Sequence, residues 1–132
     1  YLVLATGAKY AVPKAEIEAI RIHADDLFKA ATRLKHASSA VIIGGGLVGV
    51  ELAGEITHYM SKTKISIVHP KEHLIHRNNE KAIKACERYL LKKGVNMIFQ
   101  DKVVGKKGVH YITEKNQQVR GDIAFLCAGI RS

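Results

Sequence analysis

The chain has 132 residues, 47% of them hydrophobic, and its 21 basic residues against 12 acidic ones give a formal net charge of +9. This length fits one domain with a core of its own. The two cysteines, Cys86 and Cys127, exclude a disulfide scaffold and a cysteine metal cluster, and no apolar run approaches the ~20 residues of a membrane-crossing helix. We therefore expect free thiols in a reducing, intracellular compartment.

The positive charge suggests an anionic partner, and nucleic acid is the first class to consider. The basic residues are spread over almost every expected helix and turn, usually beside acidic ones, and aromatic residues make up only 6% of the chain. Few side chains are therefore available to stack on bases. The sequence favours solvated basic faces and no binding of nucleic acid.

The first half of the chain predicts two strands and two helices. Residues 1–5 predict a buried strand, followed by a turn at Pro13. Residues 25–34 predict a helix with two acidic residues in its first turn, where the helix dipole stabilises negative charge. Residues 40–43 form a short all-apolar strand, and residues 47–60 resume a helical period after a cluster of glycines. The apolar face of the first helix consists of Leu27, Phe28, Ala31 and Leu34.

The second half continues the alternation. Residues 65–69 predict a strand, and a helix capped by Asn78 or Asn79 runs to residue 93 before a third strand at 95–99. A turn at 105–108 divides an antiparallel meander that continues to Val119, and residues 123–127 predict a last strand. The apolar stripe of the helix consists of Ala82, Ile83, Cys86, Tyr89 and Leu90.

Strands and helices that alternate in this way, with strands that are continuously apolar, indicate a parallel sheet covered on both faces. We therefore predict an α/β fold: a Rossmann-like three-layer domain with a parallel sheet and an antiparallel β-meander. Its crossover connections should be right-handed.

The most informative motif lies between the strand at 40–43 and the helix at 47–60. It fits the pattern GxGxxG at Gly44, Gly46 and Gly49. The first glycine permits a tight turn, the second lets the backbone approach a pyrophosphate, and the third lets the helix lie close to the strand. The free amides and the positive dipole end of the helix then face a dinucleotide phosphate. The residues expected at this site are Gly44, Gly45, Gly46, Leu47, Val48 and Gly49.

Two other interpretations of this motif were weighed. A glycine-rich turn can serve only to make a sharp corner, and methyltransferases use a similar loop, usually without the third glycine in this register. The context favours the dinucleotide, because the motif follows an apolar strand and opens an amphipathic helix. A stripe of small and apolar residues on that helix is expected to pack on Val41 and Ile43; it consists of Gly49, Ala53, Ile56 and Met60.

The residue that ends the next strand predicts how the adenosine ribose is held. An NAD site usually places Asp or Glu there, but this chain has His69, followed by Pro70 and Lys71. A carboxylate would repel a 2′-phosphate, whereas His69 and Lys71 could attract one. The hypothesis is that NADPH is accepted at least as readily as NADH; the alternatives are ordinary exposed polar residues or a ribose contact from Glu72.

Three blocks of sequence resemble the central NAD(P)H-binding domain of the pyridine nucleotide-disulphide oxidoreductase superfamily, nearest to its apoptosis-inducing-factor-like and type II NADH dehydrogenase branches. Residues 2–8 are similar to the ATG segment that closes the family's first FAD stretch. Residues 41–55 carry the glycine motif, and residues 122–129 are similar to the strand that leads back into the FAD domain. Because the glycine motif follows the ATG block, it resembles the nicotinamide site and not the flavin site.

The resemblance implies a fragment of a larger flavoprotein. Residues 1–13 would end a FAD-binding segment and linker, and residues 14–132 would form the NAD(P)H-binding domain. In such proteins a hydride passes from the nicotinamide to FAD, held by another domain of the same parent chain, and electrons continue to a quinone, a disulphide or another acceptor.

The resemblance also assigns residues near the nicotinamide. Glu51 would lie beside it, and Ala128, Gly129 and Ile130 would pass under it. The last two residues depart from the family's usual Pro-Asn ending, so the resemblance is weaker there.

Several features of a complete enzyme are missing from the sequence. There is no FAD fingerprint and no redox pair of cysteines, so we expect dinucleotide binding without turnover and assign no catalytic residue. The histidines show no metal-ligand spacing, and we expect no metal. Two other classes stay open: a degenerate Rossmann domain that serves as a protein-interaction module, and a short dehydrogenase. Tyr89 and Lys93 have the spacing of the latter class, but Tyr89 is expected on the packed face of its helix.

Overall fold

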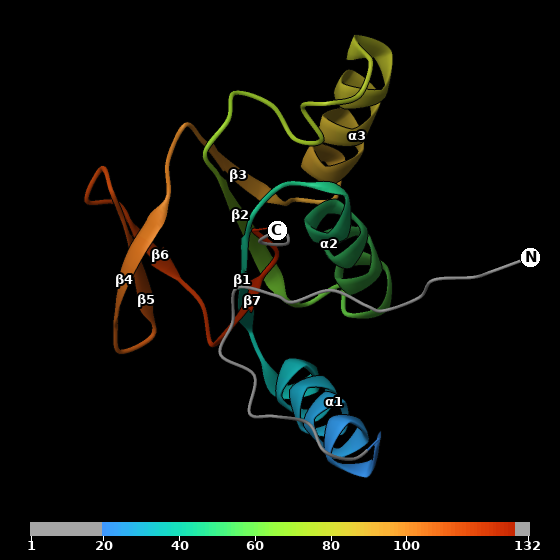
Figure 1. Cartoon of the computed structure of the whole chain (residues 1–132), viewed down its shortest axis with the longest axis vertical. Helices are drawn as coiled ribbons and strands as arrows, with labels where there is room; N and C mark the ends of the chain where they lie inside the picture. The colour runs from blue at the N-terminus through green and yellow to red at the C-terminus, as the bar shows by residue number, and fades with distance from the viewer. Residues whose placement is uncertain (1–19, 129–132) are drawn as a thin grey trace, which may run out of the picture.

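Four parallel strands form the centre of the structure, a computed structural model that describes residues 20–128 (Figure 1). The strand predicted at 1–5 and the turn at Pro13 lie outside this range. Neighbouring strands are hydrogen-bonded in the order β3-β2-β1-β7, and every pair is parallel. Most of their residues are apolar, as a sheet covered on both faces requires. The strands are β1 (Ser39–Ile43), β2 (Lys64–His69), β3 (Asn96–Phe99) and β7 (Ile123–Leu126).

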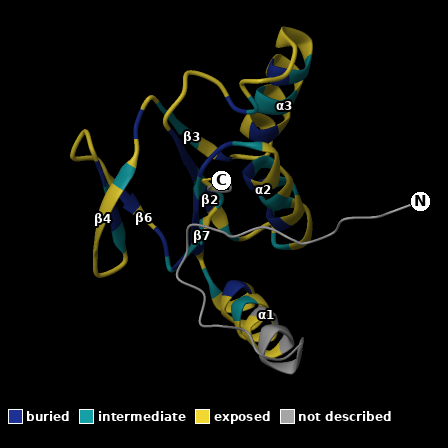
Figure 2. Ribbon diagram, viewed as in Figure 1, coloured by how far each residue is buried: buried dark blue, intermediate teal, exposed yellow. Residues whose placement is uncertain are grey.

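Helices cover one face of this sheet and enclose the larger of two cores (Figures 1 and 2). α2 (Leu47–Tyr59) follows β1, and α3 (Glu80–Lys92) follows β2 after a ten-residue connection, residues 70–79. α1 (Ile20–His36) precedes β1 and contributes Leu34. Buried residues of the cluster include Ala40, Ile42, Ala53, Ile56, Ile67 and Leu90.

A small antiparallel sheet covers the opposite face (Figure 1). It consists of β4 (Val103–Lys107), β5 (His110–Thr113) and β6 (Gln118–Arg120), in that order. The three-layer α/β fold with a parallel sheet and a meander, predicted from the sequence, is confirmed. The second core, between the two sheets, contains Val41, Val68, Tyr111 and Val119.

The turn of the meander was placed too early by the sequence analysis. Gly105 lies inside β4, at a register shift after Val103, and Lys107 pairs with His110. The chain reverses instead at Gly108, whose φ of +59° favours glycine. The two glycines therefore have different roles: Gly105 accommodates a β-bulge, and Gly108 forms the turn.

The packing of α2 on β1 also differs from the prediction in one respect. Gly49, Ala53 and Ile56 are buried as predicted. They face Ile42, however, whereas Val41 and Ile43 point to the meander. Side chains alternate between the faces of a strand, and an all-apolar strand gives no sequence signal for which set faces the helices.

Two helices differ from their predicted boundaries or faces. α1 starts at Ile20, so the two acids expected in its first turn lie further along it. Phe28 is 74% exposed and Tyr89 is 48% exposed, although both were expected on packed faces. α3 buries Ile83 and Leu90, and Tyr89 lies about 100° around the helix from Leu90. Within residues 20–128, no helix combines the length and the apolarity that crossing a membrane requires.

Asp122 fixes the start of β7 beside the start of β1. Its Oδ2 atom accepts hydrogen bonds from the Ser38 hydroxyl at 2.6 Å, the Ser38 N–H at 2.9 Å and the Ser39 N–H at 3.0 Å. These bonds, led by the one from the Ser38 hydroxyl, lower the pKa of the Asp122 carboxyl against the opposing effect of burial. The bonds hold β7 in register with β1, so that both strands end at the same edge of the sheet.

Candidate functional site

The carboxyl ends of β1, β2 and β7 surround a cavity of about 910 Å³. From β1 the chain passes to β2 on one side, while β7 lies on the other side, so the strand order reverses at β1. In open α/β sheets, ligands bind in the crevice at such a reversal. We call this space the carboxyl-end cavity.

Gly44 makes the turn that leaves β1. Its φ is +113°, which L side chains rarely adopt, and a Cβ there would lie 2.5 Å from the Cys127 carbonyl oxygen. The Gly44 N–H donates to the Val68 carbonyl at 2.9 Å, which continues the pairing of β1 with β2 for one more residue. The tight turn assigned to this glycine is confirmed.

Gly49 lets α2 approach the turn. A Cβ at this position would collide with the Gly44 carbonyl oxygen and would lie 3.2 Å from the Ile42 side chain. Because the first collision is with main chain, no rotamer change relieves it. The close packing of helix on strand predicted for Gly49 is confirmed.

Gly46 differs from both, because its missing side chain leaves open space. Nothing lies within 4 Å of the position of a Cβ, and its φ of −76° is accessible to any residue. Among the residues that the structure describes, the N–H groups of Gly46, Leu47 and Val48 have no hydrogen-bond acceptor, and all three residues line the cavity. The start of α2 therefore presents three free donors, together with its positive dipole end, to the cavity.

Gly45 has another role than the one predicted. Its N–H is not free, because it donates to Nδ1 of His69 at 3.0 Å. A Cβ would collide with the Leu74 side chain and lie 3.1 Å from the His69 ring. Gly45 is buried and does not line the cavity in the described part of the chain. It is a glycine for packing reasons, and it holds the turn instead of facing a ligand.

His69 is buried, with 6% of its surface exposed, so it is not an ordinary exposed polar residue. Burial, together with the neighbouring His76 and Lys71, lowers the pKa of its ring, against the opposing effect of the His73 backbone carbonyl. Nδ1 is an acceptor here, so the ring is neutral with its proton on Nε2. At neutral pH the ring therefore carries no positive charge with which to attract a 2′-phosphate, and Nε2 has no partner among the described residues.

The structure brings together only part of the predicted site. The cavity is lined by Gly44, Gly46, Leu47, Val48, His69 and Ala128. Lys71 and Glu51 are exposed outside the lining, the second of them on the second turn of α2. Gly129 and Ile130 lie outside the described residues.

The sequence analysis missed the lining that the connection 70–79 provides. This segment folds back onto the glycine turn, where the Ile75 N–H donates to the Gly45 carbonyl at 2.8 Å. Ile75 has a φ of +40°, an uncommon conformation for a β-branched residue. His76, Arg77 and Asn78 also line the cavity. No local pattern marks these residues; Asn78 was considered only as a helix cap, and Asn79 is the cap, accepting from the Ala82 N–H at 2.9 Å.

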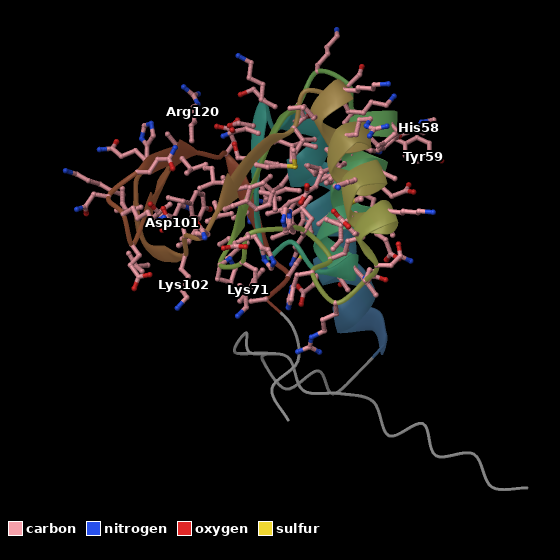
Figure 3. All side chains as sticks on the ribbon, turned by 90° about the horizontal axis from the view of Figure 1, so that it is seen from above. His58, Tyr59, Lys71, Asp101, Lys102 and Arg120 are labelled. Carbon is pink, nitrogen blue, oxygen red and sulfur yellow. The ribbon has the colours of Figure 1, made fainter. Side chains whose placement is uncertain are left out.

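The charged groups of the cavity suit an anionic ligand. Arg77 and Lys102 line it, and Figure 3 shows Lys71 on the same side of the molecule as Lys102. Asp101 is the acidic residue of the lining, and its carboxylate accepts from the backbone N–H groups of Lys102 and Lys115 at 2.8 and 3.3 Å. Two basic side chains and one carboxylate therefore line the cavity, so its net charge is positive. In residues 20–128, no group of three or more His, Cys, Asp or Glu side chains has the arrangement of a metal site.

The cysteines are both partly buried against the larger core. Burial raises the pKa of the Cys86 and Cys127 thiols, so both are neutral near pH 7. This agrees with the prediction of free thiols that act as small apolar side chains.

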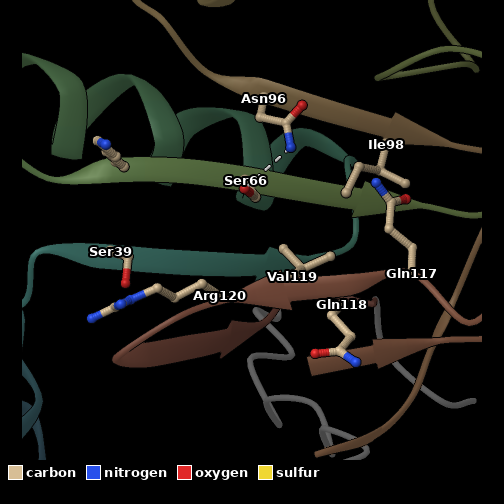
Figure 4. Close-up of a pocket in the computed structure, with 9 residues that line it drawn as sticks. Ser39, Ser66, Asn96, Ile98, Gln117, Gln118, Val119 and Arg120 are labelled. Atoms are coloured by element: carbon tan, nitrogen blue, oxygen red, sulfur yellow. Dashed lines mark hydrogen bonds between the residues drawn. The ribbon is translucent and has the colours of Figure 1, made fainter. Parts of the chain in front are cut away.

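A second, smaller cavity of about 200 Å³ lies at the other end of the sheet, between the amino-terminal halves of the strands and the meander (Figure 4). Its lining is made mostly of polar side chains, with Ile98 and Val119 beside them; we call it the amino-end cavity. Asn96 and Ser66 form a hydrogen bond of 3.4 Å within it. The lining residues include Ser39, Lys64, Ser66, Asn96, Gln118 and Arg120.

Comparison with known proteins gives relatives of one kind. The sequence profile of the pyridine nucleotide-disulphide oxidoreductase family matches residues 1–132. A ferroptosis suppressor protein 1 of Xenopus tropicalis is 28% identical and covers 99% of this chain, and apoptosis-inducing factor homolog A of Dictyostelium discoideum is 34% identical over 78% of it. This chain spans 38% and 28% of those two proteins.

Solved structures share the fold. The water-forming NADH oxidase of Lactobacillus brevis, bound to NADH, superposes with a TM-score of 0.73 at 22% identity, over 95% of this chain and 29% of the oxidase. A ferredoxin reductase of Rhodopseudomonas palustris superposes with a TM-score of 0.72 at 14% identity, over 80% of this chain and 27% of the reductase.

Proposed function

Because the chain belongs to the pyridine nucleotide-disulphide oxidoreductase family, we propose that it binds NAD(P)H and presents the nicotinamide for hydride transfer to FAD in a larger flavoprotein. The observation that carries this proposal is the set of three unpaired amides, Gly46, Leu47 and Val48, at the start of α2. Backbone donors at a helix start bind phosphate in dinucleotide sites.

The residues present fit such a ligand. The missing side chain of Gly46 leaves its amide open to a diphosphate, where any Cβ would project into the empty space. Arg77 and Lys102 supply positive charge on the side of β2, and Ala128 lines the opposite side, after β7. The nicotinamide supplies the hydride when it is bound. The contribution of this chain is to hold the diphosphate and so to direct the two halves of the ligand to opposite sides of β1.

The same proposal includes the choice between NADH and NADPH. The ribose contact that Glu72 could provide is weakened, because its carboxylate accepts a hydrogen bond from the Gln100 side chain at 3.0 Å. His69 is neutral, which leaves Arg77, Lys102 and Lys71 as the nearby positive charges, beside the Asp101 carboxylate. These cations support acceptance of NADPH at least as readily as NADH. A preference for NADH above about tenfold, or about 1.4 kcal/mol, would contradict this part of the proposal.

For the whole protein we propose a FAD domain in the same parent chain, with residues 1–13 as the linker from it and residues 14–132 as the dinucleotide domain. The parent would pass electrons to a quinone, a disulphide or another acceptor. The two cysteines have neither the spacing of a redox pair nor that of a metal cluster, which supports a reducing, intracellular compartment.

Titration with NADH, followed by fluorescence or calorimetry, tests the proposal. Gly46→Val should reduce the affinity by at least about tenfold, because the side chain occupies the space of the phosphate, while the melting transition stays cooperative. Gly54→Ala is the matched control, since a Cβ at Gly54 also meets nothing within 4 Å but lies further along α2. It should bind as the unmodified chain does.

Two results would contradict the proposal. Equal affinity of Gly46→Val and the unmodified chain would place the dinucleotide elsewhere. No saturable binding of NADH or NADPH by the unmodified chain would instead favour a degenerate domain that serves as a protein-interaction module. Tyr89 is exposed, so burial of its side chain does not argue against a short dehydrogenase. However, neither Tyr89 nor Lys93 is among the residues that line the carboxyl-end cavity.

A further inference from the structure

Both peptide groups that flank Gly45 are held by hydrogen bonds. Its N–H donates to Nδ1 of His69 at 3.0 Å, and its carbonyl accepts the Ile75 N–H at 2.8 Å. The space beside it is filled by the Leu74 side chain and the His69 ring. The Gly45–Gly46 peptide, which Ile75 holds through the carbonyl, carries the Gly46 N–H, and His69 holds the peptide before it, so the two bonds together set the direction of the next N–H groups along the turn. His69 therefore acts on the phosphate-binding turn from the end of a different strand.

We propose that His69 is a positioning residue: its neutral ring withdraws the Gly45 N–H from the ligand and fixes the turn, so that the amides of Gly46, Leu47 and Val48 point into the cavity. This inference rests on the proposed dinucleotide site. It differs from the ribose contact usual at the end of this strand, because the ring faces the backbone of the turn.

The chemistry of the position explains why a neutral histidine suits it. A leucine would leave the buried Gly45 N–H without an acceptor, which is unfavourable. An aspartate could accept the same bond but would place a negative charge beside the site of a phosphate. A neutral imidazole accepts the bond and adds no charge, and its other nitrogen carries the proton.

Protonation of the ring would remove the acceptor, since both nitrogens of an imidazolium ion are donors. The groups around it disfavour that charge. The His76 ring lies 5.6 Å away between centroids, Lys71 is nearby, and Arg77 and Lys102 line the same cavity. The Asp101 carboxylate, which accepts from two backbone N–H groups, is the negative group of the lining, and the His73 backbone also favours the charged ring.

Acid should weaken both the fold around His69 and the binding of the dinucleotide. The pKa of His69 is lowered from its ordinary value of 6.5, so the neutral ring is stabilised relative to the unfolded chain. The stability that the neutral ring contributes is complete above pH 6.5 and is lost as the pH falls through the lower pKa that His69 has in the folded chain. Dinucleotide affinity should fall in the same range, because the turn loses one of its two anchors.

The first test needs no ligand. Long-range ¹H–¹⁵N NMR correlations of the full chain report the tautomer of each histidine and its titration. The expected result for His69 is a proton on Nε2 at neutral pH and a midpoint below 6.5, with the Gly45 amide shift following the same curve. A proton on Nδ1, or a Gly45 amide that does not follow His69, would overturn the inference even if NADH binds.

The second test uses variants and NADH titrations at two pH values, about pH 7.5 and an acidic pH below the midpoint that the NMR titration gives for His69. His69→Asn places an amide oxygen near the position of Nδ1 and does not titrate; it should bind within about threefold of the unmodified chain at both pH values. His69→Leu lacks the acceptor and should bind about fivefold to tenfold more weakly at both. The unmodified chain should weaken by about fivefold between the two.

A matched control removes an imidazole elsewhere. His58 is exposed in the last turn of α2, at the end remote from the glycine turn, so His58→Gln should keep the pH dependence of the unmodified chain. A His69→Asn variant that loses affinity in acid as strongly as the unmodified chain would overturn the inference. If the unmodified chain binds no dinucleotide at either pH, the proposed function fails, and the NMR titration alone decides the role of His69.

Discussion

The two ends of the parallel sheet are both hollow, but they are built from different parts of the chain. The carboxyl-end cavity, of about 910 Å³, exposes backbone amides at the start of a helix. The amino-end cavity, of about 200 Å³, exposes side chains, some of which bond to one another, as Asn96 does to Ser66 (Figure 4). The first offers unpaired donors in fixed positions, and the second offers flexible groups that are partly paired.

This difference follows from the topology. In a parallel sheet with helical crossovers, helices start near the carboxyl ends of strands, so the positive ends of their dipoles gather there. The glycine turn adds to this effect, because Gly46 has no side chain to cover the amides. The amino end is polar only through its side chains, and polar side chains without free backbone amides do not form a phosphate site.

The three glycines of the turn differ in what an added side chain would meet. Gly44 and Gly49 lack side chains because backbone lies in the way, whereas Gly46 lacks one with nothing in the way. The same residue type is therefore required for packing at two positions and, in the proposed function, for binding at the third. Substitutions with alanine separate these roles.

The largest effect on stability is expected for Gly49→Ala. Its Cβ would meet the Gly44 carbonyl oxygen, and α2 would have to move away from β1. We expect a loss of about 3 kcal/mol in the free energy of unfolding, at the upper end of the usual cost of overpacking. Urea denaturation measures it, and a loss below about 1 kcal/mol would show that the helix can shift without penalty.

Arg77→Ala tests the charge of the carboxyl-end cavity. We expect NADPH affinity to fall by about tenfold, the size of a charge-assisted hydrogen bond, and NADH affinity to change by less than about twofold. Calorimetric titration with both dinucleotides measures the ratio. Equal losses of affinity for NADPH and NADH would mean that Arg77 contacts a part that both dinucleotides have, and not the 2′-phosphate.

Gly54→Ala should stabilise the chain by about 0.5–1 kcal/mol, because glycine in a helix interior is unfavourable and the added methyl group has room. Chemical denaturation provides the measurement. A destabilised variant would mean that α2 is packed more tightly at this position than the described residues indicate.

Asn96→Ala is the smallest change and tests the amino end. Its side chain is exposed and its bond to Ser66 is long, so we expect a stability change within about 0.5 kcal/mol. NADH affinity should stay the same in a parallel titration. A clear loss of affinity would place the ligand at the wrong end of the sheet for this account.

The sequence predicted the elements that depend on local patterns. Apolar runs marked the strands of the parallel sheet, and the spacing of Gly44, Gly46 and Gly49 marked the turn. The face of β1 was wrong because a uniformly apolar strand carries no alternation. Phe28 and Tyr89 were placed on packed faces because apolar character indicates burial only where another element is present to cover it.

The contacts of the site depended on tertiary structure and could not be predicted in the same way. His69 meets Gly45, 24 residues away, because β1 and β2 are neighbours in the sheet. The connection 70–79 reaches the turn through a bond from Ile75 to Gly45 that no motif encodes. Spacing along the chain thus located the turn that we propose to bind phosphate, while the residues that hold this turn are distant in the sequence.

The central claim is that the unpaired amides at the start of α2 bind a dinucleotide phosphate. A ¹H–¹⁵N correlation spectrum of the chain titrated with NADH tests it most directly, because it follows each amide separately. The account predicts saturable shifts that are largest at Gly46, Leu47 and Val48 and small at Ser66 and Asn96. Saturable shifts centred on the amino-end cavity, or no saturable shifts at all, would contradict it.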